Sequence, residues 1–233
     1  MFKNISFKEF IENKYSLFLS PISDLSCNHK NKFIQDQRKL FNFDKMVCEF
    51  YNETHKPKSA DALYMLDDNT VLFIEFKTGY KDKVIIRSLD ENKYCQKCYD
   101  KILKNICNEK FNYFIKYKDL IKEDKKKAIF LKIAESYIMF KEKFISEYSD
   151  EYNVNDINYK FLFWLVIDAP VDSFPISFKK KNHTDSKDNA NNVFIDMQNS
   201  MKRFYDKNNS SYYNEILVLN PHEFINKIND FLN

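Results

Sequence analysis

Glycine is almost absent from this sequence. Its 233 residues include a single glycine, Gly79, and five prolines. A glycine-rich phosphate-binding loop needs several glycines, because the backbone must turn tightly and approach the phosphate closely. The sequence therefore excludes a loop of that kind. The one glycine directly follows a predicted strand, where we expect a positive φ or the close approach of a ligand.

Cysteine and histidine are also scarce, which argues against the common zinc sites. The five cysteines are odd in number, as is typical of reduced thiols in the cytoplasm rather than of a disulfide framework. Cys95 and Cys98 have the spacing of a zinc or redox pair, but both lie on the apolar face of a predicted helix without a second pair. We interpret them as buried thiols. The four histidines form no H-E-x-x-H motif.

Long apolar runs are missing as well. The longest strongly apolar run is residues 161–167, whereas a transmembrane helix needs about 20 residues. No apolar stretch of the kind found in secretory signals follows Lys3. We therefore expect a soluble, cytoplasmic protein with no membrane partner.

Positive charge is present but not concentrated. The net charge is +3, and lysine is common throughout while arginine occurs only at Arg38, Arg87 and Arg203. A dedicated DNA-binding domain is much more basic. Lysine runs at 125–127 and 179–181 could contact a phosphate backbone, but solvated surface is the better interpretation in so lysine-rich a sequence. The composition permits a polyanionic substrate without arguing for one.

The order of predicted elements indicates a mixed α/β fold. Apolar residues recur at helical spacing, as with Phe33, Leu40 and Val47, or form short runs typical of strands. Residues 109–152 are mostly helical in pattern and form an insertion, although 128–133 fits a short strand equally well. We expect one domain over residues 1–233, with a central sheet flanked by helices. The predicted helices are 7–18, 33–51, 88–107, 192–205 and 221–232, and the predicted strands are 61–66, 71–77, 84–87, 161–167 and 215–219.

Two of these strands form a predicted hairpin that carries charged residues. Residues 67–70 are turn-forming and separate two apolar runs. Because side chains alternate along a strand, Glu75 and Lys77 continue the face that carries Phe73. A hairpin of this length can bring Asp61, at the start of the first strand, beside Glu75, near the end of the second.

The chemistry of these residues points to a divalent metal. Two carboxylates about 4–5 Å apart suit Mg²⁺ or Mn²⁺, with the backbone carbonyl of Phe76 as a further oxygen ligand. The ammonium of Lys77, roughly 7 Å along the strand, can reach a metal-bound water or a phosphate. We therefore predict Asp61, Glu75 and Lys77 as catalytic residues, and Asp61, Glu75 and Phe76 as metal ligands. The residues alone leave an ordinary interpretation open, in which Glu75 and Lys77 are solvated and Asp61 caps a turn.

The same residues carry a resemblance to a known family. Lys58-Ser59-Ala60-Asp61 and, after the hairpin, Ile74-Glu75-Phe76-Lys77 resemble the motifs of the PD-(D/E)XK nuclease superfamily. The likeness covers roughly residues 33–107, and Ala60 replaces the proline of the first motif. It implies a restriction-endonuclease-like fold, a central mixed sheet flanked by helices in the order αβββαβ, with 109–152 inserted before the strand at 161–167. It also implies metal-dependent hydrolysis of phosphodiester bonds, with DNA favoured over RNA.

Further roles follow from the resemblance. Many members carry another acid on the helix before the hairpin, for which Glu49, as a further metal ligand, and Glu53 are candidates. Lys93, Gln96 and Tyr99 on the following helix are candidates to bind substrate, although ordinary solvated side chains fit all of these positions.

The biological role and the alternatives stay open. Restriction, phage defence and a toxin role all fit a compact nuclease, and residues 109–152 could mediate a homodimer or substrate specificity. The alternative is a catalytically inactive nuclease-fold protein that binds nucleic acid or protein, against which the complete set of Asp61, Glu75 and Lys77 argues. A third interpretation is an unrelated α/β domain with a chance motif.

Overall fold

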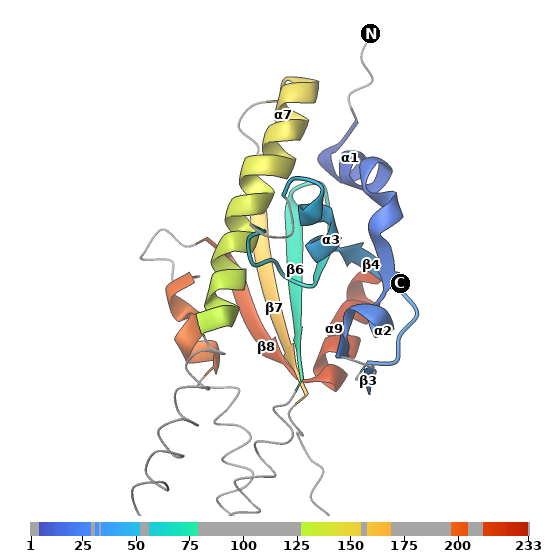
Figure 1. Cartoon of the computed structure of the whole chain (residues 1–233), viewed down its shortest axis with the longest axis vertical. Helices are drawn as coiled ribbons and strands as arrows, with labels where there is room; N and C mark the ends of the chain where they lie inside the picture. The colour runs from blue at the N-terminus through green and yellow to red at the C-terminus, as the bar shows by residue number, and fades with distance from the viewer. Residues whose placement is uncertain are drawn as a thin grey trace, which may run out of the picture.

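The computed structural model describes residues 5–28, 31–32, 34–51, 56–78, 127–154, 158–168, 197–204 and 212–232. Within these ranges the chain forms a six-stranded mixed sheet with helices on both faces, which confirms the predicted α/β class (Figure 1). The strand order is β1-β4-β5-β6-β7-β8. The strands are β1 (Leu19–Pro21), β4 (Lys39–Asn42), β5 (Ala62–Met65), β6 (Thr70–Lys77), β7 (Lys160–Ile167) and β8 (Glu215–Leu219). A separate short pair joins β2 (Cys27–Asn28) to β3 (Asn31–Lys32).

Strand β6 is where the direction of the sheet changes. Strands β1, β4, β5 and β6 pair antiparallel, whereas β6, β7 and β8 pair parallel. Parallel neighbours need a crossover connection, and a helix in the segment between β6 and β7 packs on the sheet. As a result, the end of β6, the end of β7 and the start of β5 lie at one edge of the sheet.

The predicted hairpin is present as β5 and β6. The register pairs Ala62 with Ile74 and Met65 with Val71. In the turn, the amide of Asn69 donates a 2.8 Å hydrogen bond to the carboxylate of Asp67, as turn-forming acids do. The predicted alternation also holds, since odd-numbered β6 residues such as Val71 pack on one face of the sheet and even-numbered ones such as Ile74 pack on the other.

A long helix covers one face of the sheet. Residues 127–139 continue into the π-helical η3 (Phe140–Ile145) and α7 (Ser146–Tyr152), and together they are called the long helix below. The strand alternative for 128–133 is wrong. Ile129, Ile133 and Phe140 are buried in the same core as the sheet, so the described part of the expected insertion is a layer of the main core.

Further elements complete the two layers. On the face of the long helix lie α1 (Phe7–Lys14), η1 (Ser16–Phe18), α3 (Phe43–Cys48), a helical stretch at 197–201 and η5 (Lys202–Phe204). On the other face lie α2 (Ile22–Leu25) and α9 (Pro221–Leu232). The predictions for 161–167, 215–219 and 221–232 are confirmed by β7, β8 and α9.

The helix predicted at 33–51 is wrong, because this stretch contains β4 followed by the short α3. Leu40 packs on the α9 face of the sheet and Phe41 on the face of the long helix. Adjacent residues buried on opposite faces require an extended backbone. The side chain of Asn42 then accepts a 2.9 Å hydrogen bond from the amide of Lys45 and caps α3. Burial on both faces therefore overrides the helical spacing.

Several predictions lie outside the described residues. These are the strand at 84–87, the helix at 88–107 with Cys95 and Cys98, the lysine run at 179–181, and Gly79. Within the described ranges, no helix is long and apolar enough to cross a membrane.

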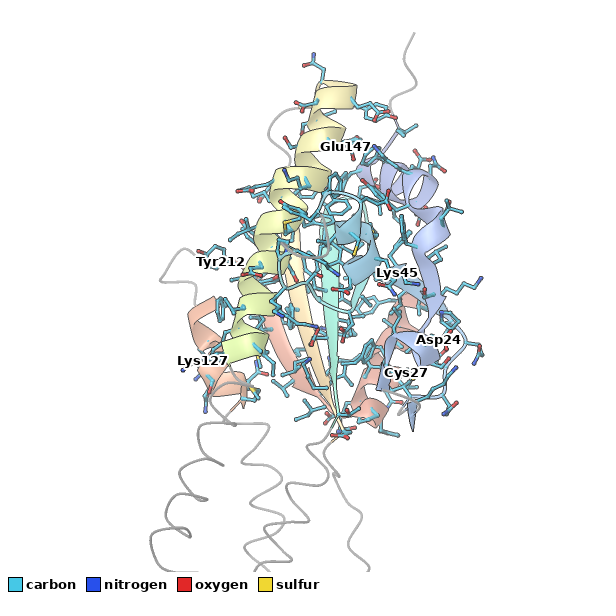
Figure 2. All side chains as sticks on the ribbon, viewed as in Figure 1. Asp24, Cys27, Lys45, Lys127, Glu147 and Tyr212 are labelled. Carbon is cyan, nitrogen blue, oxygen red and sulfur yellow. The ribbon has the colours of Figure 1, made fainter. Side chains whose placement is uncertain are left out.

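The C-terminal part of the long helix contacts α1 and the residue that follows it. The hydroxyl of Tyr15 donates a 2.8 Å hydrogen bond to Glu147, which also forms an ion pair with Lys14. Figure 2 shows Glu147 beside α1 on the upper part of the long helix, with Lys127 at the opposite end. These contacts, together with the aromatic core, hold the helix along the sheet.

Phe73 lies at the centre of that aromatic core, and its removal tests how far the fold depends on it. Its ring packs against Phe43, Phe140 and Phe161, and it is fully buried. We expect Phe73→Ala to lower the free energy of unfolding by about 3–5 kcal/mol, because it leaves a cavity in a rigid setting. Urea denaturation followed by circular dichroism measures this. Leu17→Ala, at a position 92% exposed, should change stability by less than about 0.5 kcal/mol.

Candidate active site

The hairpin places Asp61 beside the end of β6. Asp61 stands one residue before β5, so it follows the last register pair, Ala62 with Ile74, and faces Glu75 across the hairpin. Its Oδ2 accepts a 2.8 Å hydrogen bond from the amide of Phe76. This bond fixes the carboxylate against the backbone of β6. The structure therefore brings together the two acids that the sequence singles out.

Among the residues that the structure describes, Glu75 is the only charged residue that is buried. It is 0% exposed and belongs to the face of β6 that the long helix covers. Burial, and secondarily the negative charge of Asp61, raise the pKa of Glu75 to about 7, while Lys132 and Lys77 act in the opposite direction. The folded protein thus holds this carboxyl near its point of ionisation at neutral pH.

Lys77 lies next to Glu75, as strand alternation predicts. Its Nζ is 2.6 Å from Oε1 of Glu75, and its side chain is 34% exposed. The contact is an ion pair, so the buried oxygen Oε1 has the ammonium of Lys77 as its charged partner. The partly exposed ammonium can reach a bound substrate from the edge of the sheet.

Lys132 is a second cation at the site, and the sequence gives no motif that marks it. It comes from the long helix, and its Nζ lies 2.8 Å from Oε2 of Glu75 and 3.1 Å from Oδ1 of Asp61. Burial lowers the pKa of Lys132, but Glu75 and Asp61 together raise it above its ordinary value. The ammonium therefore stays charged and bridges the two carboxylates.

The long helix also makes hydrogen bonds, close to Lys132, with the segment that precedes Asp61. The backbone amide of Lys58 donates to the carboxylate of Glu135, and the amide of Ala60 donates a 2.8 Å hydrogen bond to the hydroxyl of Ser136. Glu135 and Ser136 lie three and four positions after Lys132, which places all three on one side of a helix. Polar residues at this spacing are common on solvated helices, so the spacing does not by itself mark this face as part of a site.

Asp44, in the first turn of α3, supports the segment from its other side. It accepts a 2.6 Å hydrogen bond from Ser59 and forms an ion pair with Lys56. Burial raises the pKa of Asp44, but these two partners outweigh it and hold that pKa below its usual range. Asp44 is thus the acid of α3 that contacts the motif Lys58–Asp61.

Glu49, the expected further acid, lies elsewhere. Glu49 is exposed and follows the last residue of α3. Its negative charge is one of the causes that raise the pKa of Tyr15. No group of three or more His, Cys, Asp or Glu that could hold a metal occurs in the described part of the chain. Glu49 therefore does not join Asp61 and Glu75 in such a group. The other candidates, Glu53, Lys93, Gln96 and Tyr99, lie outside the described residues.

The site occupies the edge at which ligands bind in open α/β sheets. The amide of Asp168, directly after β7, donates a 3.2 Å hydrogen bond to the carbonyl of Lys77 and continues the parallel pairing past both strands. In open α/β sheets, ligands bind outside the carboxyl ends of the parallel strands. Asp61, Glu75, Lys77 and Lys132 all gather at that end.

The donor atoms at this edge fit Mg²⁺ or Mn²⁺. Oδ1 of Asp61 and Oε2 of Glu75 already share one cation, the ammonium of Lys132, and Oε1 of Glu75 lies 2.6 Å from a second, the ammonium of Lys77. The amide of Phe76 points toward Asp61, and in a strand the carbonyl of a residue points to the same side as its amide. Mg²⁺ takes one or two carboxylates and completes its shell with water and phosphate oxygens. The predicted ligand set is thus chemically suitable.

Comparison with protein-family models, with curated proteins and with solved structures finds no match to this chain. Its function must therefore be argued from the chemistry of the site and from the resemblance of the two motifs.

The buried carboxyl predicts an unusual pH dependence of stability. The unfolded chain releases the proton of Glu75 near its ordinary pKa of 4.5, whereas the folded protein keeps it up to about pH 7. Raising the pH between these values therefore removes stability from the folded state. Between about pH 5 and pH 8, we expect the free energy of unfolding of the wild type to fall by a few kcal/mol more than that of Glu75→Gln.

Urea denaturation at several pH values, with EDTA present throughout, measures this difference. Glu142→Gln removes an exposed carboxylate from the long helix and should leave the pH dependence of the wild type unchanged. Parallel loss of stability in the wild type and in Glu75→Gln would contradict the expectation.

Proposed function

We propose that this protein is a nuclease that uses Mg²⁺ or Mn²⁺ to hydrolyse phosphodiester bonds, with DNA as its favoured substrate. The observation that carries the proposal is the buried carboxylate of Glu75, which faces Asp61 and has Lys77 beside it at one edge of the sheet. A buried acid next to a second acid is unfavourable for stability, and such groups cluster at functional sites.

The order of the elements supports the resemblance to PD-(D/E)XK nucleases. Helix α1 precedes β4, β5 and β6, and the long helix and β7 follow them, with short elements in between. With β1, α2, β2, β3 and α3 left out, this order can be written αβββαβ, and the two motifs lie at the start of β5 and the end of β6.

Each residue has a role that its position allows. Asp61, Glu75 and the carbonyl of Phe76 would hold the metal ion, which when bound lowers the pKa of a water and offsets the charge of the phosphate. Lys77, partly exposed at the end of β6, orients the attacking water and stabilises negative charge that develops on the phosphate. The hydrogen bond from Phe76 to Asp61 keeps that carboxylate in position.

One observation favours the alternative of an inactive binding module. Lys132 and Lys77 together already balance the charges of the two acids, and a closed cluster of ion pairs does not need a metal for charge balance. A protein of this kind would bind nucleic acid or protein without cleaving it.

Cleavage assays distinguish the two functions. The purified protein is incubated with supercoiled plasmid, linear double-stranded DNA, single-stranded DNA and RNA, with Mg²⁺, Mn²⁺ or EDTA. We expect cleavage with the metals and none with EDTA, and a rate lowered about a hundred-fold or more by Lys77→Ala, because a charge-stabilising group at the reacting centre is lost. Asp61→Asn and Glu75→Gln should lower the rate at least as much.

The matched control is Lys227→Ala, which removes an exposed lysine of α9 on the opposite face of the sheet and should cleave like the wild type. Cleavage that survives Lys77→Ala and Asp61→Asn would contradict the site. Binding of a nucleic acid without cleavage of any substrate would favour the inactive module.

A further inference from the structure

Lys132 occupies the space between the two acids of the site. Its ammonium is within hydrogen-bonding distance of both Asp61 and Glu75, and it reaches them from a different layer of the protein. The sequence separations of 71 and 57 residues mean that only the packing of the long helix brings these groups together. The contact is therefore a property of the folded protein and not of the hairpin.

The bridge has a clear electrostatic reason. Two carboxylates side by side repel each other, and one of them is fully buried, so they need a positive charge between them. An ammonium supplies one positive charge, whereas a divalent ion supplies two. The oxygens that Lys132 contacts, Oδ1 of Asp61 and Oε2 of Glu75, belong to the groups that would bind the ion.

We propose that Lys132 takes the place of the divalent cation in the metal-free protein and leaves that place when the cation binds. This inference rests on the proposed metal-dependent function. An ion that coordinates both oxygens at about 2.0–2.1 Å needs the space that Nζ now fills, and two cations in that space would repel each other. Lysine and metal are thus mutually exclusive between the two acids.

The side chain of Lys132 is partly open to solvent. Its side chain is 18% exposed, while the helix around it is anchored by the buried Ile129 and Ile133. A lysine has a flexible four-carbon stem, so its ammonium can turn outward while the helix stays in place. The displaced ammonium remains at the site, where it can contact the phosphate of a substrate.

Competition of this kind has a measurable consequence for metal affinity. If part of the free energy of binding is used to displace Lys132, removal of the lysine strengthens binding. We expect Lys132→Gln to bind Mn²⁺ about ten-fold more tightly than the wild type, measured by isothermal titration calorimetry and by the electron paramagnetic resonance of free Mn²⁺. Glutamine retains a hydrogen-bond donor for Glu75, and circular dichroism checks that the variant folds. The control Lys227→Gln should bind Mn²⁺ like the wild type.

A second measurement on the wild type follows Lys132 directly. Brief acetylation of lysines with an N-hydroxysuccinimide ester, followed by peptide mass spectrometry, reports how accessible each ammonium is. We expect saturating Mn²⁺ to raise the acetylation of Lys132 several-fold and to leave that of Lys227 unchanged. This readout does not depend on a substitution or on catalysis.

The outcomes separate this inference from the proposed function. Equal or weaker Mn²⁺ binding by Lys132→Gln, or acetylation of Lys132 that Mn²⁺ leaves unchanged or lowers, overturns the role of Lys132. If Mn²⁺-dependent cleavage still requires Asp61 and Glu75 in that case, the nuclease stands and only the displacement falls. If neither the wild type nor Lys132→Gln binds Mn²⁺, both proposals fall.

Discussion

The burial of the Glu75 carboxyl inside the protein is the constraint on which the rest of the site depends. A buried carboxylate without compensation is costly, and Asp61 beside it adds to the cost. Compensation comes from Lys77 on the same strand and from Lys132 on the long helix. The register of the hairpin and the position of the helix must therefore agree closely, because a shift of either would leave a charge unpaired.

The long helix serves both the core and the site. Near its middle, Phe140 and Phe144 pack into the aromatic core around Phe73 and Phe43. About one and two turns before Phe140, Ser136 and Lys132 hold the backbone and the side chain of the residues just before β5. The packing that stabilises the fold thus also positions the acids, and damage to the core is expected to reach the site.

The mixed topology explains why the polar groups gather at one edge. Because β5 runs against β6 while β7 runs with it, the start of one strand and the ends of two others meet there. Elsewhere both faces of β6 and β7 are covered by apolar layers that leave no room for unpaired charge. Among the residues that the structure describes, this edge combines a buried strand with access from solvent at Lys77 and Lys132.

The sequence by itself determined the hairpin, the strands at 161–167 and 215–219, the last helix, and the shared strand face of Glu75 and Lys77, because alternation and turn chemistry are local. Asp61 followed from the length of the hairpin. The tertiary structure decided that residues 33–51 hold a strand, that Asp44 rather than Glu49 supports the motif, and that Lys132 bridges the acids. These features depend on burial on two faces and on contacts between distant segments, which no local pattern records.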